Sequence, residues 1–192
     1  ITADCFVPVT IGGWIASLDD IRELLAHGAD KIAVNTKAEV DPEFITEASN
    51  RFGSQCITVS IDVKETDDGY EVVTDRGENH TGRSPTEWAT EVEDRGAGEI
   101  FLTSIDQDGT QSGYDLDLIA EISEAVSIPV VASGGVGEWD HLVEGVAEAG
   151  ADAVSVANRL HHMHHSAKKA KDHMKSAGLD VREPAFSEQY DL

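Results

Sequence analysis

Residues Leu102–Asp115 read LTSIDQDGTQSGYD, and they join a short apolar strand to the start of a helix. The strand at Ile100–Leu102 runs directly into Asp106 and Asp108, and glycine and threonine follow before the helix begins near Leu116. Two carboxylates at the end of a buried strand, followed by small residues, suit the rim of an α/β barrel. The alternative is an acidic turn in which aspartate only caps the local backbone.

The rest of the chain repeats this order of strand, loop and helix about six times. Apolar strands that alternate with helices predict a parallel sheet covered by helices. Asp67-Asp68-Gly69 interrupts the order and predicts a hairpin between residues 63–64 and 70–74. The expected strands are Val7–Ile11, Lys31–Asn35, Cys56–Asp62, Glu99–Thr103, Ile128–Ala132 and Ala153–Ala157.

An internal repeat sharpens the fold prediction, because Val7–Asn35 can be laid on Ile128–Asn158. Each copy has Val-Pro-Val or Ile-Pro-Val, a strand, Gly-Gly, a helix, Gly-Ala-Asp and a strand ending at asparagine. We therefore predict a (β/α)8 TIM barrel of two similar halves. Six strands in 192 residues fall short of the ~250 residues typical of that fold, so the first two βα units are expected to be missing. Residues 1–182 would form the partial barrel, and 183–192 a C-terminal tail.

The composition excludes some partners. Acids outnumber bases 37 to 14, which gives a formal net charge of −23 and a pI near 4.4. Nucleic acids and anionic membranes need a basic face, so neither is expected as a partner. Two cysteines, no signal peptide and no long apolar run indicate a soluble cytoplasmic protein, and the acidic surface fits a salt-rich cytoplasm.

Two Gly-Gly pairs follow strands and suggest phosphate sites. Glycine lets the backbone approach a ligand closely, and N–H groups at a helix start can bind a phosphate dianion. Ordinary helix-start turns also use Gly-Gly, but two copies related by a repeat favour phosphate binding. One predicted site combines Gly12 and Gly13 with Asn35 and Thr36, and the other combines Ser133, Gly134 and Gly135 with Ala157 and Asn158.

Charged side chains at both ends of the strands are further candidates. Asp62 ends a strand at the same mouth as Asp106 and Asp108, where a carboxylate can act as general acid or base or can cap a turn. One of the latter two is expected to be catalytic and the other structural. Lys31 and Glu99 lie at the opposite strand ends, as solvated charges or as a gate into the barrel. The histidines at 161, 162, 164 and 165 lack acidic or cysteine partners nearby, so neither a metal nor a cofactor is expected.

The chain resembles the HisF family, the cyclase subunit of imidazole glycerol phosphate synthase. The resemblance is carried by FGSQCITVSID, GAGEIFLTSIDQDGTQSGYD, SIPVVASGGVGEWDH and GADKIAVNT, which are residues 52–62, 96–115, 127–141 and 28–36. It implies a (β/α)8 lyase that uses ammonia from a HisH-like glutaminase, its heterodimer partner. This enzyme would convert a bis-phosphorylated phosphoribulosyl-formimino substrate to imidazole glycerol phosphate and an aminoimidazole carboxamide ribotide.

The resemblance also assigns roles to residues. Asp62 matches a catalytic aspartate, and Lys31 and Glu99 match two members of the charged ring at the ammonia entrance, with Gln55 nearby. The substrate and phosphate positions are matched by Gly12, Gly13, Asn35, Thr36, Asp108, Gly109, Thr110, Ser133, Gly134, Gly135 and Asn158.

Two departures from the family pattern keep alternatives open. Trp14 stands where the family usually has glycine, and an indole there would crowd or reshape the first phosphate loop. Leu160-His161-His162 replaces the usual Phe-His-Phe. The helix SAKKAKDHMKSAG also resembles the AglZ and WbuZ branch, which serves acetamidino modification of surface sugars. A non-catalytic barrel that only docks a glutaminase is the third alternative.

Overall fold

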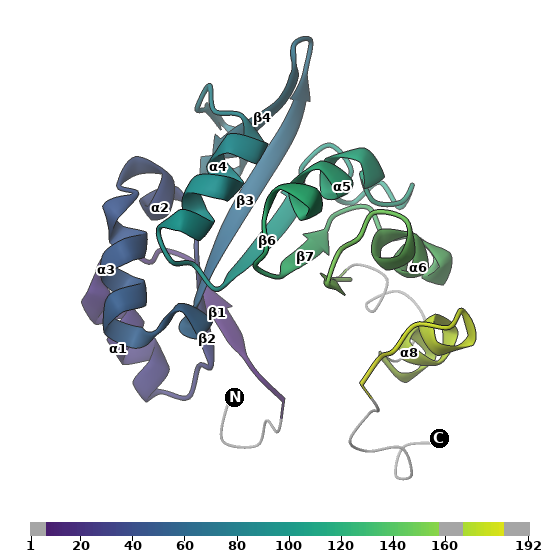
Figure 1. Cartoon of the computed structure of the whole chain (residues 1–192), viewed down its shortest axis with the longest axis horizontal. Coiled ribbons are helices and arrows are strands. Elements are labelled where there is room, and N and C mark those ends of the chain that lie inside the picture. The colour runs from purple at the N-terminus through teal and green to yellow at the C-terminus, as the bar shows by residue number, and fades with distance from the viewer. Residues whose placement is uncertain (1–6, 158–166, 183–192) are drawn as a thin grey trace.

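The computed structural model describes residues 7–157 and 167–182 and contains one curled parallel sheet with helices on its outer side (Figure 1). Each parallel strand pairs with the next in register, from Thr10 opposite Lys31 to Val131 opposite Ala153. Within the described residues the sheet stays open between its first and last strands. The parallel strands, in pairing order, are β1 (Thr10–Gly12), β2 (Lys31–Val34), β3 (Ile57–Thr66), β6 (Glu99–Ser104), β7 (Val130–Ser133) and β8 (Ala153–Val154).

Helices connect these strands and begin at side-chain caps that the sequence carries. Ser17, Ser84 and Asp115 each accept a hydrogen bond from a backbone N–H in the first helical turn. The helices are α1 (Leu18–Ala26), α2 (Thr36–Val40), α3 (Glu43–Phe52), α4 (Pro85–Asp94), α5 (Leu116–Ala125), α6 (Trp139–Ala147) and α8 (Ala167–Ser176). Two 3-10 turns, η2 (Ser54–Cys56) and η3 (Asp75–Gly77), complete the connections. This arrangement is part of a (β/α)8 barrel, as predicted.

The two faces of the sheet differ in burial. In β3, Ile57, Val59 and Ile61 are at most 1% exposed, and they lie on the side that the helices cover. The alternate residues face the concave side and are mostly half-buried, with polar side chains at both ends of the strands. This alternation of buried and half-buried residues along each strand was not predicted from the apolar strands of the sequence. It gives the concave side the chemical groups that a site needs.

The internal repeat has a structural reason at the helix-to-strand junctions. Asp30 Oδ2 accepts a hydrogen bond from Val9 N at 2.8 Å, and Asp30 N donates to Val9 O at 2.9 Å. Asp152 makes the same pair of bonds with Val130, at 2.9 Å and 3.0 Å. The Gly-Ala-Asp motif therefore ends one helix and fastens the start of the neighbouring strand, once in each copy.

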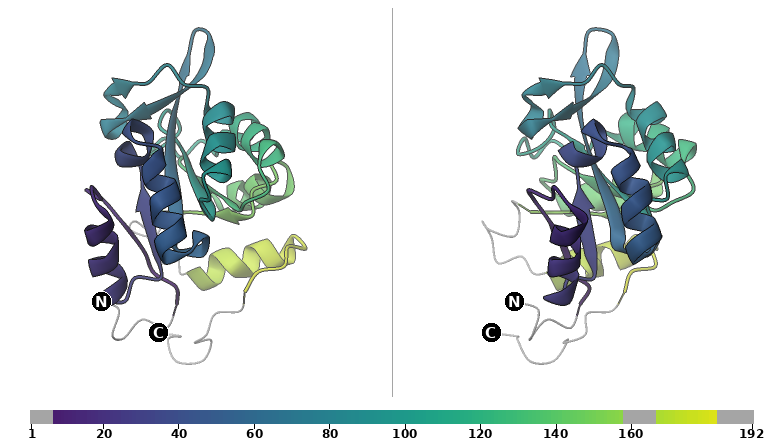
Figure 2. Two further views of the ribbon diagram at one scale, coloured as in Figure 1. Left: turned by 60° about the vertical axis from the view of Figure 1, so that its left-hand side comes forward. Right: turned by 90° about the vertical axis from the view of Figure 1, so that its left-hand side faces the viewer.

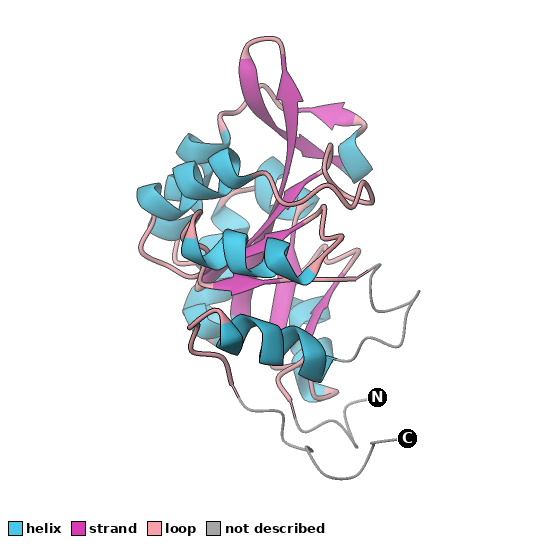
Figure 3. Cartoon of the chain, turned by 90° about the vertical axis from the view of Figure 1, so that its right-hand side faces the viewer, coloured by secondary structure: helices cyan, strands magenta, loops and turns pink. Residues whose placement is uncertain are grey.

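A hairpin projects beyond the strand ends that carry the loops (Figures 1 and 2). β3 continues past the predicted end at Asp62 to Thr66, and it pairs antiparallel with β4 (Gly69–Thr74). A short strand, β5 (Asn79–His80), extends the hairpin, as the colouring of Figure 3 makes plain. The predicted hairpin is confirmed, whereas β5, both 3-10 turns and α2 were not anticipated. β8 is shorter than the predicted strand Ala153–Ala157.

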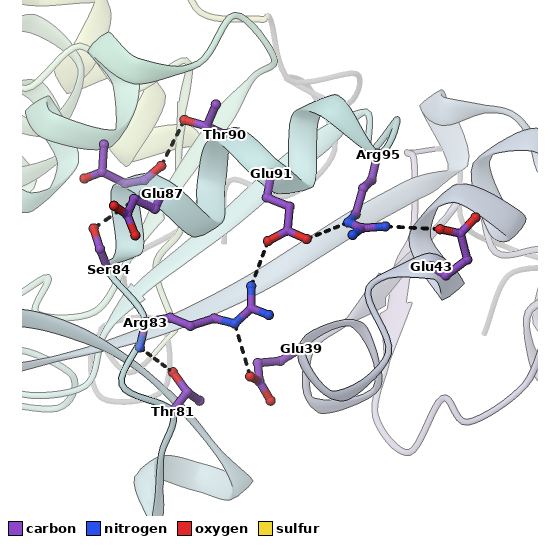
Figure 4. Close-up of polar contacts among 10 residues, drawn as sticks. Glu39, Glu43, Thr81, Arg83, Ser84, Glu87, Thr90, Glu91 and Arg95 are labelled. Atoms are coloured by element: carbon purple, nitrogen blue, oxygen red, sulfur yellow. Dashed lines mark hydrogen bonds and ion pairs between the residues drawn. The ribbon is translucent and has the colours of Figure 1, made fainter.

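An ion-pair network joins α4 to the helices of the preceding unit (Figure 4). Arg83 donates to Glu91 at 2.8 Å and lies 3.4 Å from Glu39, while Arg95 bridges Glu91 at 2.8 Å and Glu43 at 3.2 Å. Burial acts to raise the pKa of Glu91, but hydrogen bonds from both arginines outweigh it and lower that pKa. The Arg83 guanidinium also lies 4.5 Å from the ring centroid of the buried Trp88. The network thus couples surface charges to the core.

We expect Arg83→Lys to destabilise the fold by about 1 kcal/mol, because lysine keeps the charge but loses the two-pronged pairing and the stacking. Arg22→Lys is the matched control, since Arg22 pairs with Asp19 of its own helix and both side chains are at least half exposed. The free energy of unfolding should change by less than about 0.5 kcal/mol in the control. Urea denaturation at low and high salt measures both. Equal losses in the two variants would contradict a special role for Arg83.

Among the described residues, no helix combines the length and the apolar character that crossing a membrane requires.

Candidate active site

The candidate catalytic carboxylate lies on the concave side of the sheet. Asp62 pairs with Thr103 of β6 at the point where β3 leaves the parallel sheet and enters the hairpin. Asn35 follows the last residue of the neighbouring β2, and its Nδ2 donates to Asp62 Oδ2 at 2.8 Å. The sequence placed both residues at this mouth, but it gave no sign of the bond between them.

Burial raises the pKa of the Asp62 carboxyl group above its usual range. Hydrogen bonds from the side chains of Asn35 and Ser60 oppose the shift, and the negative charge of Asp108 adds to it. A raised pKa makes a carboxylate a stronger base, which favours proton exchange with a reacting group. Asp62 therefore has the environment of a general acid–base group.

A cavity of about 350 Å³ has Asp108 in its wall. Three loops contribute to its wall: the one after β6, the one after β7, and the segment after β8. The lining residues are Asp108, Gly109, Gln111, Ser133, Gly134, Gly135, Val136, Ser155, Val156 and Ala157. Gln111, Val136, Ser155 and Val156 were not predicted, since a polar or apolar residue in a loop carries no distinctive pattern.

The glycines of this cavity are required by the close packing of two loops. A Cβ on Gly135 would lie 1.9 Å from Gly113 O, and a Cβ on Gly134 would lie 2.7 Å from Ser104 O. Gly113 N donates to Gly135 O at 2.8 Å, which fixes the loops together. The buried N–H groups of Gly135 and Val136 donate to no other described residue. These groups precede the N-cap Glu138 of α6, and phosphate binding at the second Gly-Gly loop stays a prediction.

The first Gly-Gly loop is more open. At Gly12, β1 passes so close to β2 that a Cβ would lie 2.9 Å from Ala33. A Cβ on Gly13 would meet nothing within 4 Å. Trp14 has φ +59°, a conformation that costs a residue with a side chain about 1–2 kcal/mol. Its side chain is 91% exposed, so the indole points into solvent and does not fill the loop. The backbone is left-handed at Gly13 too, with φ +106°, and the effect of Trp14 on ligand binding in this loop stays a prediction.

Asp106 and Asp108 have different surroundings. The Asp106 carboxylate accepts a hydrogen bond from Glu65 N at 2.7 Å and so ties the hairpin to the loop after β6. Asp108 lines the cavity. Tyr70 adds a second tie, donating its hydroxyl to Asp115 Oδ1 at 2.9 Å. Of the two acids that the sequence could not tell apart, Asp106 therefore holds the hairpin and Asp108 lies in the cavity wall.

Thr110 and Thr36 stand apart from the cavity wall. The Thr110 hydroxyl donates to Gln107 O at 2.7 Å and shapes its own loop, and Thr36 is the first residue of α2. Their predicted contacts with a ligand stay predictions.

Lys31 and Glu99 form an ion pair at the opposite end of the concave side. Lys31 Nζ lies 2.5 Å from Glu99 Oε2, and the hydroxyl of Thr58 donates to Glu99 Oε1 at 2.9 Å. Only 16% of the Glu99 side chain is exposed. Gln55, in η2, is exposed.

Asn158 and the histidines between 161 and 165 lie outside the described residues. Within the part of the chain that the structure describes, no three His, Cys, Asp or Glu side chains are placed to hold a metal ion.

A family model described as histidine biosynthesis protein matches residues 1–166. The match covers most of the chain, including both Gly-Gly loops, Asp62, the cavity and the Lys31–Glu99 pair.

Proposed function

Because this chain belongs to the histidine biosynthesis protein family, we propose that it acts as a HisF-like cyclase, which closes an imidazole ring with ammonia. Family membership makes it a barrel enzyme of histidine-biosynthesis type. The observation that carries the finer proposal is the position of Asp62. Its half-buried carboxylate is held by Asn35 on the concave side, at the strand ends whose loops also line the cavity.

In this proposal, three parts of the site share the work of the reaction. Backbone N–H groups of the loop after β7 bind one phosphate of the substrate, and the first Gly-Gly loop binds the other. Asp62 takes a proton from the incoming nitrogen and returns one to the leaving group. Asn35 keeps the carboxylate aimed along the concave side. Two bound phosphates would hold the reacting carbon between them.

We further propose that ammonia enters past the Lys31–Glu99 pair from a glutaminase partner. Both residues lie at the start of their strands and face the concave side, as Asp62 does. Thr58 and Ser60 occupy the same side of β3 between the pair and Asp62. At about 3.3 Å per residue, the route from Thr58 to Asp62 is roughly 13 Å long. On β3 the side chains along it are small and polar, which suits a molecule such as ammonia, and Phe101 of β6 lies opposite Ser60.

Glu99→Gln is expected to reduce glutamine-dependent turnover about tenfold and to leave turnover with saturating ammonium within about twofold, because the variant breaks the ion pair but not the site. Asp41→Asn is the matched control, since Asp41 forms an i,i+4 pair with Lys37 at 2.8 Å on an exposed helix end. Steady-state rates with each nitrogen source provide the measurement. A parallel loss with both sources would argue against a gate.

One observation favours a second candidate function, the amidation of surface sugars by a HisF-like protein. Trp14 occupies a loop position where the family usually has glycine, and a different ligand would account for it.

Turnover distinguishes these functions. The full chain, supplied with ammonium and the phosphoribulosyl-formimino substrate, should form imidazole glycerol phosphate. A docking barrel would show neither turnover nor tight binding of this substrate, and a folded protein without turnover would favour the sugar-modifying branch.

A further inference from the structure

Trp14 is the residue whose conformation and exposure the proposed reaction leaves unexplained. Its left-handed backbone is unfavourable for any residue but glycine, and its large apolar ring is 91% exposed. The left-handed backbone costs free energy, and sites where local strain is retained are enriched for function. The two properties together point to a contact made with something outside the described residues.

The internal repeat shows where Trp14 stands. Counted back from the helix caps Ser17 and Glu138, Trp14 corresponds to Gly135 and Gly13 corresponds to Gly134. All four residues have positive φ, 59° and 101° for the first pair and 106° and 97° for the second. The next residues in the two loops, Ile15 and Val136, are both 8% exposed. The loops therefore share one backbone form, and Trp14 occupies a position that lines the cavity in the other copy.

A side chain fits at this position only in the first copy. In the second, the loop after β6 covers the site so closely that a Cβ on Gly135 would strike Gly113 O at 1.9 Å. In the first, the space around a Cβ at the adjacent Gly13 is open to 4 Å. The indole therefore extends from a loop at the end of β1 that has the same backbone conformation as the second Gly-Gly loop. The neighbouring β2 leads to Asn35 and, through it, to Asp62.

We propose that the Trp14 indole determines ligand specificity by stacking on the planar heterocycle of a phosphorylated ligand bound at the first Gly-Gly loop. The identity of the ligand rests on the proposed function, whereas the stacking rests on the geometry. Asp62 and Asp108 make the mouth of the barrel acidic. The neutral Trp14 indole can increase the affinity for a ligand there without adding charge. In a ribotide the ribose joins the phosphate to the heterocycle, so a phosphate bound by the backbone of this loop would leave the heterocycle near the Trp14 side chain.

Binding of two probes to the full chain tests the proposal. Aminoimidazole carboxamide ribotide carries a heterocycle, and ribose 5-phosphate has the same sugar phosphate without it. Trp14→Ala should weaken binding of the ribotide about five- to twentyfold and change binding of ribose 5-phosphate by less than about twofold. Trp14→Phe should retain most of the ribotide affinity. The ribotide, but not ribose 5-phosphate, should also quench the tryptophan emission that Trp14→Phe removes.

Trp14→Gly separates the ring from the backbone. Glycine relieves the left-handed strain and alanine does not, but both remove the ring, so both should lose ribotide affinity alike. Recovery of affinity in the glycine variant alone, tighter binding of both probes, or no change in any variant would each overturn the proposal. So would a wild-type chain that binds neither probe. If the chain binds the ribotide through the ring but has no cyclase turnover, the proposed function is wrong and the stacking proposal still holds.

Discussion

Asp62→Asn is expected to reduce ammonia-dependent turnover by about 10²–10⁴-fold, the usual contribution of a general acid–base group. The KM for the phosphoribulosyl-formimino substrate should change little, because the phosphates are bound by loops that the substitution does not touch. The asparagine can still accept the hydrogen bond that Asn35 donates at 2.8 Å, so the local geometry should persist. What the variant loses is the ability to take up and release a proton.

The stability of Asp62→Asn shows whether a loss of turnover could come from unfolding. Burial raises the folded-state pKa of Asp62, so its contribution to stability is fully present below the ordinary aspartate pKa and is lost as pH rises through the raised value. Asparagine is never charged and avoids the cost of a buried carboxylate. At neutral pH the variant should therefore be at least as stable as the wild type, and relatively less stable in acid, as denaturation at several pH values can measure.

Asp106→Asn is the matched control for Asp62→Asn. Asp106 lies at the end of the next strand and receives the same substitution, but its carboxylate only accepts a hydrogen bond from Glu65 N. An amide oxygen can replace that acceptor, so we expect turnover to fall by less than about tenfold. Similar losses in the two variants would contradict the assignment of Asp62 as the acid–base group and of Asp106 as a structural residue.

Local patterns in the sequence were enough to predict the alternating elements and the mouth of the barrel. Capping residues, Gly-Gly pairs and the hairpin turn each depend on a few neighbouring residues, so each can be recognised in the sequence alone. Asp62 was found because a carboxylate at a strand end is a local signal. The Gly-Ala-Asp repeat was found in the same way, and the structure adds its reason in the bonds from Asp30 to Val9 and from Asp152 to Val130.

Features that depend on distant segments were not predictable. The bond between Asn35 and Asp62 requires the register of β2 against β3, and the role of Asp106 requires the hairpin to fold back over the next loop. A third helix-to-strand junction reads Gly96-Ala97-Gly98, without the aspartate of the other two. Its last glycine is explained only by η2, because a Cβ on Gly98 would lie 2.2 Å from Ser54 O.

Gly135→Ala is expected to lower the free energy of unfolding by about 3 kcal/mol or more and to abolish measurable phosphate binding in the cavity. The backbone at Gly135 has φ +101°, which alanine tolerates poorly, and the added methyl group would overlap Gly113 O at 1.9 Å. Relief of that overlap requires the loops after β6 and β7 to separate. The separation would break the hydrogen bond from Gly113 N to Gly135 O and displace Asp108, which shares the cavity wall.

Gly13→Ala separates the effect of backbone strain from the effect of steric overlap between the loops. Gly13 has φ +106°, close to the value at Gly135, but a Cβ there meets nothing within 4 Å. Its loss of stability should be only about 1–2 kcal/mol, since it reports the backbone strain alone. The difference between the variants, measured by urea denaturation and by calorimetric titration with inorganic phosphate, is then the contribution of close loop packing. Equal losses would mean that the second loop can open without cost. In that case its glycines serve backbone conformation only, and the structural difference between the two halves would not explain why one loop tolerates Trp14 and the other requires glycine.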